Sequence, residues 1–137
     1  MIRIALLYGF AMAALIGAAD AGWLTRLSDV VQEWPHLDKV LHFTLYGVLA
    51  LLANLAVLGT GRWSPLRSIV TGSVLVLIVA TAEEYSNQFI DVRDYSLGDL
   101  AANYLGILVV GVLPLVPRLL VSRRVARAEA ALPRARS

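Results

Sequence analysis

Polar residues that can bind anions or transfer protons stand at the ends of apolar runs in this chain. Lys39 and His42 open one such run, Glu84 closes the next, and Asp99 and Asn103 open the last. An ionisable group at membrane depth is costly, so it usually has a function. An imidazole that titrates near neutral pH, set beside carboxylates, would form an acid–base pair. We therefore predict His42, Glu84 and Asp99 as candidate catalytic residues.

Two cations near the same chain segments suit an anionic headgroup. Lys39 would contribute a point charge, and Arg93 a planar fork that matches phosphate or carboxylate. Asn103 would add an amide one turn inside the last apolar run. We predict these three as headgroup-binding residues. Helical spacing places further polar side chains on the same faces, and these supporting residues are Asp38, Tyr46, Asn87 and Gln88.

Each of these residues also has a purely structural explanation. Asp38 stands where a helix N-cap would be, and the Lys39 ammonium could reach the membrane surface along its own stem. Ser96 and Asp99 have the spacing of a capping box. His42 could be a packing histidine that bonds a carboxylate. The whole set could therefore be a buried ion-pair network that locks the helices together.

The sequence predicts no cofactor and no metal site. His36 and His42 are the only histidines, and neither belongs to a spacing typical of metal ligands. Zinc could bind only if His42 met two carboxylates from elsewhere in the chain. The absence of cysteine excludes disulfides, thiolate ligands and cysteine nucleophiles. The glycines form no P-loop pattern, so ATP use is not expected.

Composition predicts a membrane protein. The chain has 137 residues, 58% of them hydrophobic, and a mean hydropathy of +0.71, which is more apolar surface than a soluble core of this size could bury. A bilayer core about 30 Å thick needs roughly 20 apolar residues per helix. Four stretches meet or approach this length: 4–19, 40–58, 66–82 and 100–121. We predict an all-α bundle of four transmembrane helices in one domain (1–121), followed by a basic tail (122–137).

A short amphipathic helix is expected between the first two spans. Apolar residues between Trp23 and Trp34 recur at helical spacing, with charged residues on the other face, and Pro35 would end the helix. Such a segment would lie in the membrane interface with its indoles at headgroup depth. It would act as an anchor, or as a lid over a lipid site.

Basic residues are segregated along the chain and predict the orientation. One side would carry Arg3, Arg62, Arg67 and the arginines of the last 20 residues, with Glu129 as its one acid. The other side would carry nine acids and three bases. The positive-inside rule then predicts a protein of the cytoplasmic membrane with both termini in the cytoplasm. The basic tail would contact anionic lipid rather than nucleic acid. The first span could alternatively be a cleaved signal peptide, which would not change the remaining topology.

Two residues inside the spans suggest close helix packing. Asn54 lies deep in the second span and is expected to form interhelical hydrogen bonds. Gly106 follows Asn103 on the same face of the last span and would let a neighbouring helix approach closely.

The order and spacing of the polar residues resemble the VanZ-like family of small bacterial membrane proteins. The pattern begins Asp38-Lys39-x-x-His42-Phe43-x-x-Tyr46 and continues through Glu84, Phe89, Arg93, Ser96, Asp99, Asn103 and Gly106. Members often carry Gln three residues after the glutamate, where this chain has Asn87, and Pro-Gly before the arginine, where it has Asp91-Val92. The founding member of the family is associated with low-level teicoplanin resistance, which is a phenotype, and the family lacks an assigned reaction. The resemblance therefore implies no particular chemistry for this chain.

The residues support two classes of function. In the first, the protein binds or modifies the headgroup of an outer-leaflet lipid or a lipid-linked envelope precursor through an extracytoplasmic polar pocket. Any effect on glycopeptide resistance would then be indirect. In the second, it is a non-catalytic membrane scaffold whose polar residues lock the bundle. Membrane lipids are the expected partners in both, and the sequence predicts no oligomeric state.

Overall fold

The computed structural model describes residues 1–23, 34, 36–90 and 95–131. Within these ranges the ordered elements are all helical: α1 (Ile2–Asp20), α3 (Leu37–Leu58), α4 (Pro65–Ser86), η1 (Asn87–Phe89), α5 (Leu97–Gly106), η2 (Ile107–Val112), η3 (Leu113–Leu115) and α6 (Val116–Ala131). Four helices are long and apolar enough to cross a membrane: Ile2–Ala19, Leu37–Leu58, Pro65–Phe89 and Leu97–Val125. The predicted four-helix membrane bundle is therefore confirmed.

The helices extend beyond the apolar stretches that identified them. α3 begins at Leu37 and α4 continues to Ser86, so the polar residues at these ends stand on regular helix rather than in loops. The predicted interfacial helix falls mainly on residues 24–33, outside the described residues. Trp23 and Trp34, at either end of that segment, are exposed.

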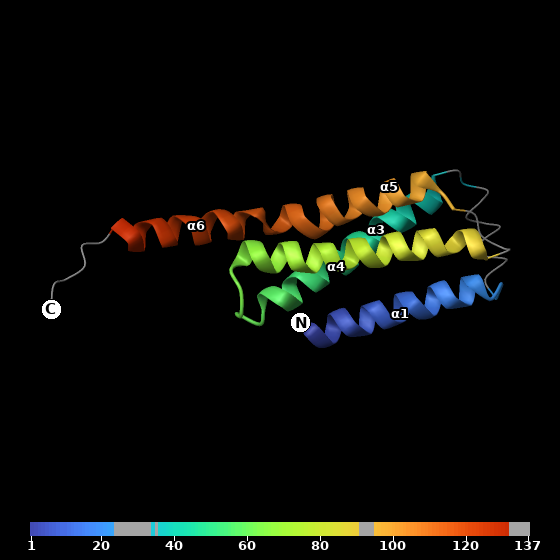
Figure 1. Ribbon diagram of the computed structural model, residues 1–137, viewed down its shortest axis with the longest axis horizontal. Helices are drawn as coiled ribbons and strands as arrows, with labels where there is room; N and C mark the ends of the chain where they lie inside the picture. The colour runs from blue at the N-terminus through green and yellow to red at the C-terminus, as the bar shows by residue number, and fades with distance from the viewer. Residues whose placement is uncertain (24–33, 35, 91–94, 132–137) are drawn as a thin grey trace.

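α3 is the central helix of the bundle, packed against α1, α4, α5 and η2. In Figure 1, α1 ends, α3 begins, α4 ends and α5 begins at one end of the bundle, and the α3–α4 turn lies at the other. Between the helices lies a small apolar core, whose buried members are Met12, Tyr46, Ala50, Val76, Ala80 and Ile107. Most other large apolar side chains are exposed, as expected of helices that face lipid.

Glycine allows α3 and α5 to pack backbone against backbone. A Cβ atom on Gly106 would collide with the carbonyl group of Phe43, and one on Gly47 would stand 2.8 Å from the Gly106 carbonyl oxygen. Neither position tolerates a side chain without moving a helix. The close approach predicted from Gly106 is therefore confirmed, and it brings the polar first turns of the two helices together.

Asn54 joins three segments in the middle of the bundle. It is fully buried, and its side-chain nitrogen donates to Ser73 Oγ and to the Gly111 carbonyl, each at 3.0 Å. Ser73 belongs to α4 and Gly111 to η2. The predicted interhelical role of Asn54 is confirmed.

The last span changes helix type before it leaves the bundle. A π-helical segment, Ile107–Val112, is followed by the 3-10 turn Leu113–Leu115, which contains Pro114. Proline has no N–H to donate and its ring crowds the preceding turn, so regular α-helix is interrupted there. α6 resumes at Val116 and extends past the other helices (Figure 1). The start of the predicted basic tail is thus helical as far as Ala131.

Candidate functional site

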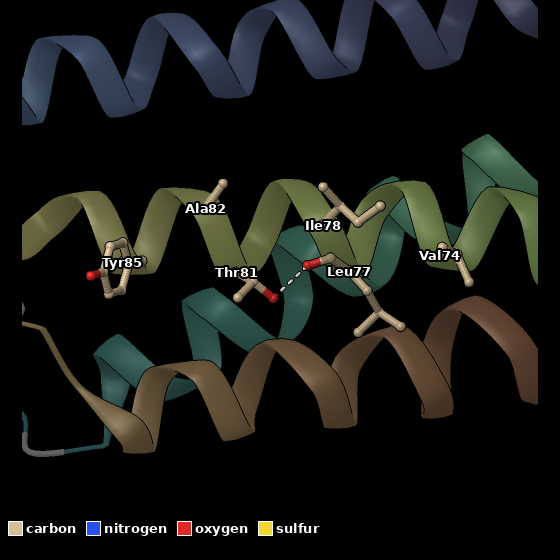
Figure 2. Close-up of a pocket in the computed structure, with 6 residues that line it drawn as sticks. All are labelled: Val74, Leu77, Ile78, Thr81, Ala82 and Tyr85. Carbon is tan, nitrogen blue, oxygen red and sulfur yellow. Dashed lines mark hydrogen bonds between the residues drawn. The ribbon is translucent and has the colours of Figure 1, made fainter.

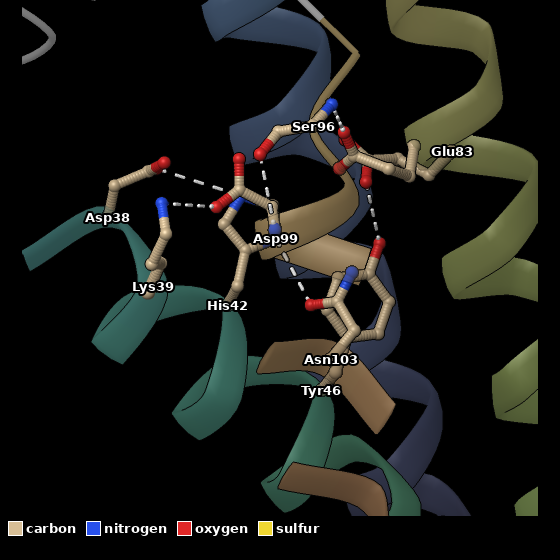
Figure 3. A network of polar contacts seen from close by, with 9 residues as sticks. Asp38, Lys39, His42, Tyr46, Glu83, Ser96, Asp99 and Asn103 are labelled. Atoms are coloured by element: carbon tan, nitrogen blue, oxygen red, sulfur yellow. Dashed lines mark hydrogen bonds and ion pairs between the residues drawn. The ribbon is translucent and has the colours of Figure 1, made fainter. Parts of the chain in front are cut away.

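Polar side chains from three helices meet at the end of the bundle where α4 ends and α5 begins (Figure 3). We call this group the polar cluster, and its members are Asp38, Lys39, His42, Tyr46, Glu83, Glu84, Ser96, Asp99 and Asn103. Helical spacing explains the contribution of α3, since Asp38, His42 and Tyr46 recur every four residues. The short distance between α3 and α5 brings Asp99 and Asn103 beside them.

Contacts between side chains join α3 to α5. Lys39 Nζ lies 3.3 Å from Asp99 Oδ1 and forms an ion pair with it. His42 Nδ1 donates to Asn103 Oδ1 at 3.1 Å, because an amide oxygen can only accept. On the other side of the imidazole, His42 Nε2 lies 3.7 Å from Asp38 Oδ1. His42 therefore stands between a carboxylate of its own helix and an amide of α5.

α4 joins the cluster through two adjacent glutamates. Tyr46 Oη donates to Glu83 Oε2 at 3.2 Å. The backbone N–H of Ser96 donates to Glu84 Oε1 at 2.7 Å. Glu84 thereby ties the end of α4 to the first turn of α5.

The expected capping box at the start of α5 is only half formed. Ser96 Oγ accepts from the backbone N–H of Asp99 at 3.3 Å, as an N-cap should. In a complete capping box, the side chain of the third helical residue accepts from the backbone N–H of the cap residue. Here Glu84 of α4 accepts from that N–H instead. This arrangement leaves the Asp99 carboxylate for the ion pair with Lys39. On α3, His36 occupies the N-cap position and Asp38 lies in the first turn, so Asp38 is not the cap.

Burial divides the cluster into a core and a rim. Glu84, Asn103 and Asp99 are buried, with exposed fractions of 1%, 0% and 7%. The side chains of Lys39 and Asp38 are 47% and 46% exposed. The rim can therefore meet a headgroup or water, whereas the buried members must find partners inside the protein.

Some buried polar atoms lack such partners. Within the described part of the chain, Glu84 Oε2, Asn103 Nδ2 and Asn87 Oδ1 have no hydrogen-bond partner. A buried polar atom left unpaired costs about 1–3 kcal/mol. Each such atom calls for an explanation, such as strain, a catalytic role or a bound water or ion.

The structure brings most of the predicted residues together but not all of them. Of the supporting residues, Asn87 is buried on η1, whereas Gln88 is exposed and donates to the Tyr85 carbonyl of the preceding turn. Arg93 lies outside the described residues. Glu83 was not among the predicted site residues, yet it contacts Tyr46 in the cluster. Adjacent residues on a helix point about 100° apart around its axis. Spacing along the sequence therefore could not predict that both glutamates lie in the polar cluster.

A separate groove runs along α4 (Figure 2). It has a volume of about 410 Å³ and is lined by Val74, Leu77, Ile78, Thr81, Ala82 and Tyr85. Thr81 Oγ1 lies 2.8 Å from the hydroxyl of Tyr104 on α5. The lining is mainly apolar and includes no member of the polar cluster, so this groove is not the polar pocket expected from the sequence.

Two groups of side chains in the cluster have the composition and spacing to hold a metal ion. They are Asp38, His42 and Asp99, and His42, Glu83 and Glu84, with one ligand atom per residue and all ligand atoms of a group within 4.8 Å of one another. His42 is common to both groups.

Comparisons with protein-family models, with curated proteins and with solved structures find no match for this chain.

Proposed function

We propose that this protein is a VanZ-like membrane protein whose polar cluster binds or modifies the headgroup of an outer-leaflet lipid or of a lipid-linked envelope precursor. The observation that carries the proposal is the meeting of α3, α4 and α5 at one end of the bundle through buried polar side chains, some of whose atoms are unpaired. Ionisable residues kept within membrane-spanning helices at such a cost are typical of ligand sites.

The division of the polar cluster into a buried core and a half-exposed rim suggests how a headgroup would bind. Lys39, half-exposed at the rim, would attract an anionic group such as phosphate. The unpaired Nδ2 of Asn103 would donate to an oxygen of the ligand. His42, which contacts both Asp38 and Asn103, would supply or remove a proton where a reaction follows binding.

The basic residues support an orientation for this site. Arg62 and Arg67 lie at the end of the bundle opposite the polar cluster, at the α3–α4 turn and the start of α4. By the positive-inside rule that end faces the cytoplasm. In this proposal the protein resides in the cytoplasmic membrane, both termini are cytoplasmic, and the cluster opens to the outer leaflet.

The second candidate function is that of a membrane scaffold, and one observation favours it. Several members of the cluster pair with one another: Lys39 with Asp99, His42 with Asn103, Tyr46 with Glu83. Paired buried groups can fix the register of packed helices without binding any ligand. The two functions differ in what a substitution at His42 should change.

A lipid profile of cells tests the proposal directly. We would compare cells producing the wild-type chain, His42→Gln, Lys39→Gln and the control His36→Gln, and quantify glycerophospholipids and polyprenyl-phosphate-linked precursors. The control suits this purpose because His36 is exposed at the start of α3. The membrane abundance of every variant would be measured by immunoblot.

Headgroup binding predicts that one lipid species accumulates or disappears in His42→Gln and Lys39→Gln while protein abundance stays within about twofold. His36→Gln should match the wild type. Unchanged lipids, or a loss of the variant proteins from the membrane, would instead favour the scaffold.

A further inference from the structure

We propose that His42, Glu83 and Glu84 form a binding site for a divalent first-row transition-metal ion, of which Zn²⁺ is the natural probe. One imidazole and two carboxylates have potential ligand atoms that lie within 4.8 Å of one another. Catalytic zinc sites have three protein ligands, such as two histidines and a glutamate, and leave a fourth position open for water or a substrate oxygen. The site does not depend on the proposed headgroup function, and either can fail without the other.

The buried state of Glu84 is an independent argument for a bound cation. Its side chain is 1% exposed, and Oε1 is already satisfied by the Ser96 N–H at 2.7 Å. Oε2 has no hydrogen-bond partner among the described residues. A carboxylate oxygen that is buried and unpaired is costly, and a bound cation would remove that cost.

The hydrogen bond of His42 favours its role as a ligand. Metal-binding histidines usually donate the second ring N–H to an oxygen acceptor, which fixes the ring orientation and the tautomer. Asn103 supplies such an acceptor, since its Oδ1 lies 3.1 Å from Nδ1. In the neutral imidazole, a proton on Nδ1 leaves Nε2 with the lone pair that a metal needs.

The second group around His42 is the weaker metal site. Asp38, His42 and Asp99 also lie close together, but Asp99 Oδ1 already has the Lys39 ammonium at 3.3 Å. That charge neutralises the carboxylate and would repel a divalent ion nearby. We therefore assign the metal to the group that contains Glu83 and Glu84.

The sequence predicts no metal here because the ligands are far apart along the chain. His42 lies near the start of α3, whereas Glu83 and Glu84 lie near the end of α4. No motif of fixed spacing joins them, so only the packing of α4 against α3 creates the site.

Metal content of the purified protein tests the site. The affinity tag would be removed from the detergent-solubilised protein, and bound metal would be removed with a chelator. The protein would then be loaded with Zn²⁺, desalted and analysed for metal content by elemental mass spectrometry. The variants are His42→Gln and Glu84→Gln, with His36→Gln as the matched control. His36 is the one other histidine and is exposed.

We expect one Zn²⁺ per chain in the wild type and in His36→Gln, and at least a tenfold loss of affinity in His42→Gln and Glu84→Gln. Zn²⁺ should also raise the melting temperature of the wild type but not that of His42→Gln. Absence of Zn²⁺ from the loaded wild type, or its loss on His36→Gln, would overturn the proposal.

A measurement on the wild type alone guards against variants that fail to fold. Co²⁺ bound by imidazole and carboxylate ligands absorbs visible light, and Zn²⁺ should displace it with loss of the bands. If Co²⁺ added to the folded wild-type protein gives no bands beyond those of the free ion, the site does not exist.

Discussion

At the scale of single residues, the cluster depends on groups that serve two elements at once. Glu84 belongs to α4, but it accepts a hydrogen bond from the backbone N–H of Ser96, the N-cap residue of α5. Asp99 is released from that task and pairs with Lys39 instead. A change at Glu84 should therefore alter both the ending of α4 and the start of α5.

Replacing Glu84 with alanine should destabilise the protein more than replacing it with glutamine. Alanine leaves the Ser96 N–H without its partner, at a cost of about 1–3 kcal/mol. Glutamine keeps an oxygen that can accept, so Glu84→Gln should recover most of that loss. Thermal unfolding in detergent, in metal-free buffer, measures the difference. If both variants melt at the same temperature, the bond to Ser96 contributes nothing.

Asn54 offers a second test at this scale. Asn54→Ala removes the donor to Ser73 Oγ and to the Gly111 carbonyl and should lower the free energy of unfolding by about 1–2 kcal/mol. The control is Ser122→Ala, since among the described residues Ser122 bonds only within its own helix, to the Leu119 carbonyl. Unfolding in mixed micelles with rising SDS would give both values. Equal midpoints for the variant and the wild type would contradict the interhelical role.

At the scale of elements, the site exists because α3 and α5 approach backbone to backbone at Gly47 and Gly106. The glycine at position 106 faces the backbone of Phe43, and Gly47 faces the Gly106 carbonyl. This contact lies one turn below the pairing of His42 with Asn103 on the same two helices. The distance between the helices thus decides whether the imidazole and the amide can meet.

Gly106→Ala should separate α3 from α5 and destabilise the bundle by about 1–3 kcal/mol, because overpacking forces the backbone to shift. The control is Gly17→Ala on α1, where a Cβ atom would meet nothing within 4 Å. Melting temperatures of the two variants in the same detergent would be compared. A loss of stability in Gly17→Ala as large as in Gly106→Ala would show that the effect is not one of helix approach.

At the scale of the whole molecule, the distribution of charge separates the two ends of the bundle. The polar cluster lies at the end where α4 ends and α5 begins, and the arginines of the α3–α4 turn and of α6 lie toward the other (Figure 1). Because the chain has no cysteine, a single introduced cysteine reports on one position without interference.

We expect His36→Cys to react with a membrane-impermeant maleimide in intact spheroplasts, and Thr60→Cys to react only after the membrane is opened. Both positions are exposed, at opposite ends of α3. The expectation follows from the basic residues beside Thr60. The reverse labelling pattern would place the polar cluster in the cytoplasm and exclude an outer-leaflet ligand.

Much of the polar cluster could be predicted from where its residues lie relative to the ends of the apolar runs. Lys39, His42, Glu84, Asp99 and Asn103 were all expected at one membrane depth, because helices of similar length that run antiparallel bring alternate ends together. The pairing of these residues could not be anticipated. Glu83 illustrates the difficulty, since its contact with Tyr46 depends on how α4 is rotated about its axis.

The sequence by itself determined the class of protein and its number of spans. Whether a stretch can cross the bilayer depends on how its apolar length compares with the bilayer thickness, and that length is a local property of the stretch. It also indicated which residues would be costly to bury. Only the tertiary structure decided which partner each one has: Glu84 for the Ser96 N–H, Asp99 for Lys39, and Asn103 for His42. The physical reason is that hydrogen bonds need particular distances and angles, and these depend on helix rotation and approach, which here are governed by glycine contacts between helices far apart in the chain.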